Sequence, residues 1–146
     1  MTNTPLSTKT IWLRGAAVTG IATVINVLVA TVSAIAVDAS PTFLALTPGP
    51  VAFLTIVLMA AGTLTYAILN RFGSRVDRWF AVIAIVVALL SLAAPILLAV
   101  DPSQAPERLG QASTASASAL VPLHLIPAAA LLIALRWRTA HTSTDG

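Results

Sequence analysis

The chain has 146 residues, enough for one domain, and its composition is unlike that of a soluble protein. Hydrophobic residues make up 58% of it and charged residues only 9%, whereas charged residues are about 25% of a typical soluble domain. Eight basic and five acidic residues leave a net charge of +3, and there is no cysteine. Disulfides, thiolate metal sites and thiol redox chemistry are therefore excluded.

Four uninterrupted apolar segments run through the sequence. Each is close to the 20 or so residues that a helix rising about 1.5 Å per residue needs to cross about 30 Å of hydrocarbon. None contains Asp, Glu, Lys or Arg, and none alternates as the strands of a membrane barrel would. We predict an all-α bundle of four transmembrane helices with up-down topology, its spans at residues 15–37, 51–69, 80–100 and 116–135.

The first span also has features of a secretory signal. Lys9 and Arg14 precede it, and small residues flank Ile35 near its end, as at a signal cleavage site. The apolar core of a signal has about 7 to 15 residues, however, and the run at 15–37 is longer. We expect this segment to be retained as a helix.

Basic residues gather on one side of the predicted bundle. Seven of the eight lie in the two tails, 1–14 and 136–146, or in the loop between the second and third spans. The other two loops hold one arginine, Arg108, and most of the acidic residues. The positive-inside rule then places both tails and the middle loop in the cytoplasm, with the chain in the cell membrane.

Tryptophans adjoin these basic residues, and an indole ring favours the headgroup layer. The basic loops are too short to form a module that reads nucleic acid, so we expect no nucleic-acid partner. We expect contact with anionic lipid headgroups at the cytoplasmic face. The predicted interfacial anchors are Trp12, Arg14, Arg71, Arg75, Arg78, Trp79, Arg136, Trp137 and Arg138.

The loop at 38–50 is apolar over residues 41–46 and ends in Thr47-Pro48-Gly49-Pro50. Proline suits the first turn of a helix, where its missing N–H has no intrahelical partner, so the second span is expected to start sharply. The apolar segment is expected either to lie in the membrane interface or to fold back over the bundle, where it would act as a lid.

Three polar side chains lie deep inside the predicted spans. Asn26, Ser91 and His124 stand equally far from the cytoplasmic ends of the first, third and fourth spans, about 16 Å into the membrane. An unsatisfied polar group in hydrocarbon costs several kcal/mol, so such groups face a partner or a cavity. We predict a hydrogen-bonded cluster of these three residues near the midplane, and they are the candidate ligand-binding residues.

Prolines supply acceptors at the same level. A proline leaves the carbonyl four residues earlier without its helical donor, and Pro95 and Pro127 do this to Ser91 and Leu123. An imidazole N–H or the amide of Asn26 is a suitable donor for these carbonyls from a neighbouring helix.

Small and polar residues also recur at helical spacing along three spans, as they do where membrane helices approach closely. The stripes are Thr19, Thr23, Asn26, Ala30 and Ser33 in the first span, Thr55, Met59, Gly62 and Tyr66 in the second, and Ala84, Ala88, Ser91 and Pro95 in the third.

Several activities of small membrane proteins require residues that these spans lack. There is no intramembrane glutamate for proton-coupled drug export, no cysteine for disulfide generation and no intramembrane lysine for retinal binding. Ser91 and His124 have the atoms of a serine hydrolase but no supporting motif. One intramembrane histidine, with His141 far away in the tail, forms no metal or haem site, so we expect no metal and no cofactor.

Three short motifs are Leu46-Thr47-Pro48-Gly49-Pro50-Val51, the segment from Leu90-Ser91 to Pro95, and Leu123-His124-Leu125. Through them the chain resembles a family of uncharacterised four-helix membrane proteins from high-GC bacteria, classed as a domain of unknown function. The resemblance covers nearly all of the chain after Arg14 and implies a shared fold but no known substrate.

Two functions fit these observations. In the first, the protein is a non-enzymatic structural or interaction subunit that associates with itself or with another membrane protein, and the three polar residues hold helices together. In the second, it is a small transporter or a lipophilic-ligand binder that uses the polar cluster, with His124 suited to proton handling.

Overall fold

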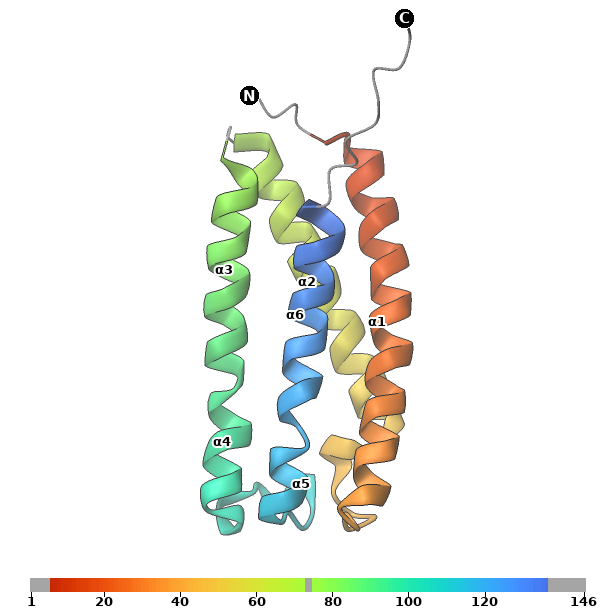
Figure 1. The fold of residues 1–146 in the computed structure, drawn as a ribbon, viewed down its shortest axis with the longest axis vertical. Coiled ribbons are helices and arrows are strands. Elements are labelled where there is room, and N and C mark those ends of the chain that lie inside the picture. The colour runs from red at the N-terminus through yellow and green to blue at the C-terminus, as the bar shows by residue number, and fades with distance from the viewer. Residues whose placement is uncertain (1–5, 73–74, 137–146) are drawn as a thin grey trace, which may run out of the picture.

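A computed structural model describes residues 6–72 and 75–136. Over these residues the chain is helical without strands, and it forms four rods that run alternately up and down (Figure 1). The predicted all-α four-helix bundle is confirmed. The rods are α1 (Thr8–Ala36), α2 (Pro48–Phe72), α3 (Val76–Ser91) with α4 (Ala93–Val100), and α5 (Thr114–Ser118) with α6 (Val121–Arg136). Three short 3-10 helices lie in the loops: η1 (Leu44–Leu46), η2 (Pro102–Gln104) and η3 (Glu107–Leu109).

All four rods are long and apolar enough to cross a membrane, at Thr8–Ala36, Pro48–Phe72, Val76–Val100 and Thr114–Leu135. Each contains most of one predicted span and extends past it. The first rod begins within the predicted tail, because Ser7 caps it: its hydroxyl oxygen accepts a hydrogen bond of 3.1 Å from the backbone N–H of Thr10. Hydropathy does not detect such a cap.

Two rods are interrupted where proline removes a helical donor. The third rod breaks at Leu92, three residues before Pro95. The fourth breaks after Ser118, whose carbonyl is the one that Pro122 leaves without a donor. The third and fourth predicted spans are therefore each two helices in line, and the shorter segments α4 and α5 pack against each other.

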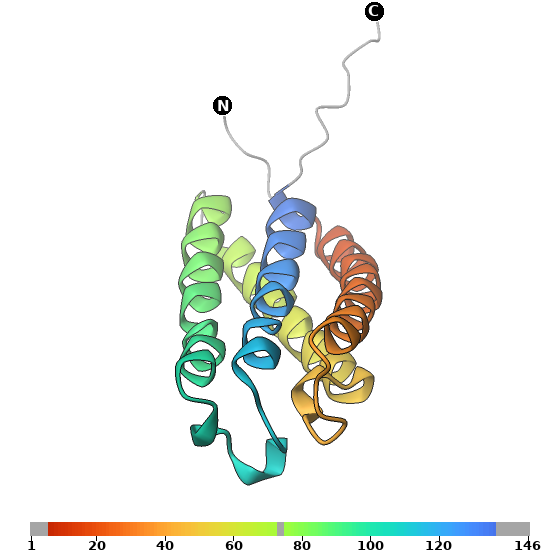
Figure 2. The same cartoon turned by 60° about the horizontal axis from the view of Figure 1, so that its bottom comes forward.

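The helices α2 and α6 lie in the middle of the bundle (Figures 1 and 2). Each contacts both α1 on one side and α3 on the other. The start of α1 and the end of α6 lie at the same end of the molecule, together with the corner between α2 and α3 (Figure 1). This end is called the basic end below, and the opposite end, with the other two loops, is the loop end.

The buried apolar side chains form two clusters, one toward each end. Near the basic end, the rings of Tyr66 and Phe80 pack in a T-shaped arrangement, with centroids 5.0 Å apart. The full cluster is Ile11, Ala22, Met59, Tyr66, Val76, Phe80, Leu131 and Leu135. At the loop end, Phe43 and Leu46 from the apolar loop segment are buried against Ala30, Val51, Leu120 and Leu123. The segment therefore folds back over the bundle, which was one of the two predicted positions.

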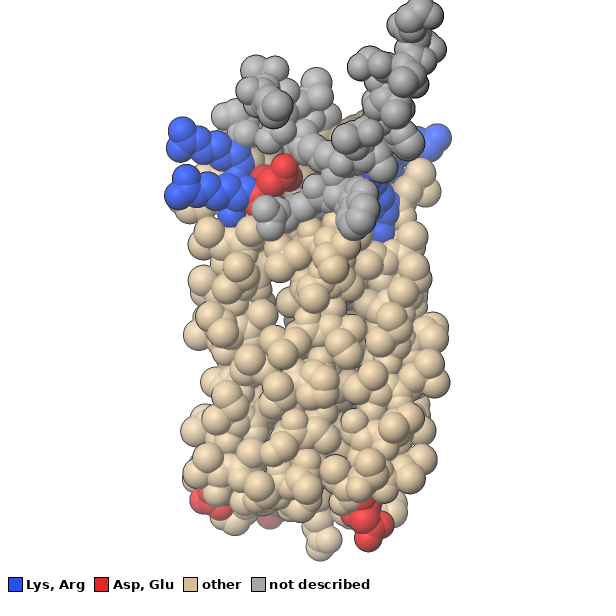
Figure 3. All heavy atoms as spheres, in the orientation of Figure 1, with Lys and Arg blue, Asp and Glu red and all other residues tan. Residues whose placement is uncertain are grey.

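Charge divides between the two ends as predicted (Figure 3). Lys9, Arg14, Arg71, Arg75 and Arg78 lie at the basic end. Asp38, Asp101 and Glu107 lie in the loops at the other end. Trp12 and Trp79 are exposed near the basic end. The predicted anchors Trp137 and Arg138 fall outside the described residues, as does the side chain of Arg136.

Candidate functional site

Asn26 forms the polar centre of the bundle. Its side chain is 2% exposed and lies on the face of α1 that meets α2 and α6. The Nδ2 group donates one hydrogen bond of 3.0 Å to the hydroxyl of Thr55 on α2 and another of 3.0 Å to the backbone carbonyl of Leu123 on α6. Both amide hydrogens of one residue thus join three helices.

The carbonyl of Leu123 is the one that Pro127 deprives of its helical donor. The amide of Asn26 takes the place of the missing N–H from a neighbouring helix. This is one of the two donors that the sequence suggested for that carbonyl. In hydrocarbon such a replacement matters, because no water is present to satisfy a free carbonyl.

Thr55 is a member of this site that was not predicted as one. It is buried on α2, and it belongs to the small and polar stripe that the sequence showed in the second span. That stripe was the available signal. Depth counted along the chain did not place Thr55 beside Asn26, because α2 crosses the bundle obliquely rather than running parallel to α1 (Figure 1).

The predicted hydrogen-bonded cluster of Asn26, Ser91 and His124 is not formed. Ser91 donates to the carbonyl of Ala88 in its own helix, at 2.7 Å. The Nδ1 atom of His124 lies 2.8 Å from the carbonyl oxygen of Leu120, also on its own rod. Since a carbonyl oxygen only accepts, Nδ1 carries the hydrogen and donates it.

The reason is local competition. Both side chains lie close to a helix break, where carbonyl groups of the same rod are within reach. A serine or histidine side chain satisfies such a carbonyl without crossing to another helix. Equal distance along the spans therefore does not determine whether the three side chains bond to one another.

The other half of the Asn26 amide is different. Its Oδ1 atom is buried and has no hydrogen-bond partner within the described part of the chain. The amide cannot be reversed, because the Leu123 carbonyl requires a donor at the Nδ2 position. The site therefore presents one acceptor without a donor, and leaving such a group unsatisfied costs about 1–3 kcal/mol.

Two further hydrogen bonds join α2 to its neighbours at the basic end, and neither was predicted. The hydroxyl of Tyr66 donates to the carboxylate of Asp77 at 2.8 Å, joining α2 to α3. Asn70 donates from Nδ2 to the backbone carbonyl of Leu6 at 2.9 Å, joining α2 to the segment before α1. The sequence analysis included Tyr66 in the stripe of the second span but gave no sign of its partner.

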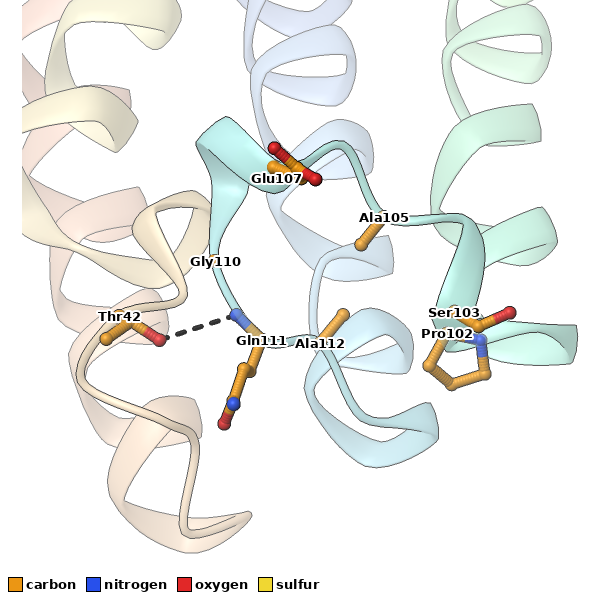
Figure 4. A pocket seen from close by; sticks show the side chains of 8 residues that line it. All are labelled: Thr42, Pro102, Ser103, Ala105, Glu107, Gly110, Gln111 and Ala112. Atoms are coloured by element: carbon orange, nitrogen blue, oxygen red, sulfur yellow. Dashed lines mark hydrogen bonds between the residues drawn. The ribbon is translucent and has the colours of Figure 1, made fainter.

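An open groove of about 740 Å³ lies among the loops at the loop end (Figure 4). It is lined by Thr42, Pro102, Ser103, Ala105, Glu107, Gly110, Gln111 and Ala112. The backbone N–H of Gln111 donates to the hydroxyl of Thr42 at 3.4 Å, which holds the two loops together. Gly110 has φ +77°, and a Cβ there would lie 1.9 Å from the carbonyl oxygen of Thr42, so the contact requires glycine.

Comparison with known proteins gives a family and nothing beyond it. No curated protein and no solved structure matches the chain. A family of unknown function, DUF6069, matches residues 6–141, which is almost all of the chain. The match carries no substrate, cofactor or partner, and the predicted likeness to an uncharacterised family is confirmed to that extent. The chain is a four-helix protein with membrane-spanning character that belongs to the family of unknown function DUF6069.

Proposed function

We propose that the protein is a non-enzymatic, multi-pass subunit of the cell membrane with a structural or interaction role. Both tails face the cytoplasm, as the positive-inside rule requires of a bundle with one basic end. One observation carries the proposal: the side chain of Asn26 is buried, and both of its N–H donors bond to groups of the protein itself. The Asn26 side chain therefore links helices of the bundle to one another through hydrogen bonds.

The rest of the polar interior supports this role. The predicted stripes are half-buried or buried, with Asn26 and Ala30 buried on α1 and Thr55 and Met59 on α2. They hold the protein's own helices together, so they are not free to bind a second copy. The flanks carry large aliphatic side chains, which suit lipid or the apolar flank of another membrane protein.

A second candidate function is binding or transport of a lipophilic ligand. One observation favours it, the buried Oδ1 acceptor of Asn26. A ligand for this atom has to carry a hydroxyl or N–H donor, and the helices have to part to admit it. The two candidates differ in how polar variants should behave.

The test compares function with the amount of folded protein. In a deletion strain, complementation is measured for Asn26→Leu, Thr55→Val, His124→Ala and the packing variant Gly15→Val, together with the abundance of folded protein in the membrane. A structural subunit loses function in proportion to folded protein, so all four variants fall on one curve. Asn26→Leu or His124→Ala lying well below the curve that Gly15→Val defines would contradict the structural role and favour the ligand site.

The absence of native cysteine makes a direct test of association possible. A Cβ at Gly20 on α1 would have no neighbouring atom within 4 Å, so Gly20→Cys is accommodated on the outer flank. An interaction subunit is expected to give a specific crosslinked product from at least one flank position when α1, α2 and α3 are scanned. Uniform absence of crosslinks at native expression would contradict an interaction role.

A further inference from the structure

Three arginines meet at the corner between α2 and α3. Arg71 lies in the last turn of α2, Arg75 precedes the first turn of α3, and Arg78 lies within that turn. All three are exposed, and no ion pair joins them to a carboxylate of the described residues. Figure 3 shows basic side chains over this corner, apart from those at the start of α1. We call Arg71, Arg75 and Arg78 the arginine corner.

Among the described residues, Asp77 is the carboxylate at this corner, and it does not cancel the charge of the three arginines. Asp77 stands between Arg75 and Arg78 in the sequence, but it is half-buried and accepts a hydrogen bond from the buried Tyr66 hydroxyl. Its position is fixed on the inner side of the corner by that bond. The three guanidinium groups therefore form an exposed patch of positive charge with few competing partners.

Aromatic side chains place the patch at the membrane surface. Phe72 is 81% exposed at the end of α2, and Trp79 is 58% exposed in the first turn of α3. A tryptophan at a helix end favours the headgroup layer, and an exposed phenylalanine is more favourable there or in lipid than in water. We therefore expect the guanidinium groups beside them at the level of lipid phosphates.

We propose that the arginine corner is a binding site for the headgroup phosphate of an anionic phospholipid. The inference rests on the proposed membrane location and goes beyond it, because it assigns binding to one corner and not to the whole basic end. A guanidinium presents a planar fork of donors that matches phosphate oxygens in pairs. With three guanidinium groups at one corner, a phosphate can accept paired hydrogen bonds from more than one arginine. Isolated cations give only non-specific electrostatic attraction.

Basic residues elsewhere provide a matched comparison. Lys9 at the start of α1 and Arg108 in the loop end are exposed cations outside the corner. If headgroup attraction were only a matter of net charge, removal of Lys9 would weaken lipid binding as much as removal of one corner arginine. Attraction of about 1 kcal/mol per basic residue corresponds to about a fivefold change in affinity for each arginine that contacts the lipid.

The experiment uses the full chain in a neutral detergent, with phosphatidylglycerol added and bound lipid counted by native mass spectrometry. Phosphatidylcholine, which has a phosphate but no net charge, is the reference lipid. Wild type is expected to retain phosphatidylglycerol selectively. The triple variant R71Q/R75Q/R78Q is expected to lose it by about 100-fold, whereas K9Q and R108Q change retention less than twofold. Circular dichroism and thermal unfolding show whether each variant is folded.

A second triple variant has lysine at the same three positions and keeps the positive charge. It controls for the possibility that the glutamine variant loses lipid binding because it misfolds. It is expected to bind phosphatidylglycerol more weakly than wild type but far better than the glutamine variant. Equal losses in K9Q and in single corner variants would overturn the site in favour of diffuse attraction. Displacement of the lipid by millimolar inorganic phosphate would show that free phosphate is the occupant and would also overturn it.

These outcomes are separate from those of the proposed function. A bundle that loses the arginine corner but keeps its stability and its complementation leaves the structural role intact. Conversely, a polar variant that fails to complement says nothing against lipid binding at the corner.

Discussion

The central helices α2 and α6 and the peripheral α3–α4 rod are equally suited to a membrane but sit in different surroundings. In its most apolar stretch the α3–α4 rod has 6% of its residues buried in the protein, against 28% for α2 and for the α5–α6 rod. Yet the α3–α4 rod is the most apolar of the four. In lipid, apolar surface gives no reason for helices to associate, because the hydrocarbon chains are as apolar as leucine.

What distinguishes the buried helices is the presence of small and polar residues at their contacts. Gly15 on α1 meets Thr63 on α2, Gly62 on α2 meets Leu131 on α6, and Asn26 joins all three helices. Over residues 82–90 the exposed side chains of α3 are all branched aliphatic. The comparison predicts that substitutions at the small and polar contacts among α1, α2 and α6 lower the free energy of unfolding. Substitutions on the outer face of α3 are expected to have little effect on it.

The largest effect is expected for Gly15→Val. A Cβ at this position would lie 2.3 Å from Cγ2 of Thr63, and the Thr63 hydroxyl is held by a hydrogen bond of 2.9 Å to the Met59 carbonyl. The helices α1 and α2 must then separate, at a cost of about 3 kcal/mol. Unfolding in mixed micelles, followed by tryptophan fluorescence, measures the loss.

Gly20→Val is the matched control, because it makes the same change in the same helix with nothing within 4 Å of the new Cβ. It is expected to change the free energy of unfolding by less than about 1 kcal/mol. Equal losses at Gly15 and Gly20 would show that helix propensity, and not the close contact with Thr63, decides stability.

Next in size is Asn26→Leu, which removes two interhelical hydrogen bonds and leaves the Leu123 carbonyl without a donor. Interhelical bonds in membranes contribute about 0.6 kcal/mol each on average, and the orphaned carbonyl adds to this. Removal of the unpaired Oδ1 offsets part of the loss, so we expect a net loss of about 2 kcal/mol. The same unfolding assay measures it.

A double-mutant cycle with Pro127→Ala tests the cause. Alanine at 127 restores a backbone N–H that can donate to the Leu123 carbonyl. The Asn26→Leu substitution is therefore expected to cost about 1 kcal/mol less in the Pro127→Ala background than in the wild type. If the losses in the free energy of unfolding of the two single variants simply add in the double variant, the hydrogen bond to the Leu123 carbonyl is not the source of the stabilisation by Asn26.

The sequence predicted the parts of this picture that depend on position along a helix. Hydropathy located four spans, and the rule that proline frees the carbonyl four residues earlier identified Leu123 as an acceptor and Asn26 as one possible donor. The spacing of small residues in the second span identified Thr55 and Met59 as buried.

The sequence did not predict what depends on the direction in which a side chain points. Ser91 and His124 were expected to bond across helices, but each bonds a carbonyl of its own rod near a break. The tilt of α2, which brings Thr55 to Asn26, is a property of packing among all four rods. The link between Tyr66 and Asp77 depends on how tightly the chain turns between α2 and α3, which composition does not determine.

A smaller effect is expected for Ser91→Ala and His124→Ala. Each removes a hydrogen bond within one rod, and the Leu120 carbonyl still accepts from the backbone N–H of Leu123 at 3.1 Å. We expect losses below about 1 kcal/mol for both. A loss at His124 as large as that at Asn26 would mean that the imidazole has a role across helices that its contact with Leu120 does not explain.

The smallest effect concerns a set of hydrogen bonds in a loop outside the four membrane-spanning segments. At the loop end Asp101 follows the third rod, and its carboxylate accepts hydrogen bonds from the Ser103 hydroxyl, from Gln104 at 2.9 Å and from the Ser103 backbone N–H at 3.1 Å. The Ser103 hydroxyl bond is the main cause that lowers the pKa of Asp101 below its ordinary value, followed by the bond from Gln104. Because the folded pKa is the lower one, the stabilisation is present above the ordinary value and is lost as the pH falls through the folded pKa.

Carboxyl NMR of the labelled protein checks this directly. Ser103→Ala is expected to raise the pKa of Asp101 toward its ordinary value. Ser118→Ala removes a hydrogen bond to the carbonyl of Thr114 instead, and is expected to leave the pKa of Asp101 unchanged. Neither should change the unfolding of the bundle measurably at neutral pH, because water replaces a lost partner at an exposed carboxylate. The hydrogen bonds of Asn26 and of Asp101 are similar in length. Loss of those at Asn26 is expected to lower the free energy of unfolding, whereas loss of those at Asp101 is expected to change it little. A large unfolding effect of Ser103→Ala would break that contrast.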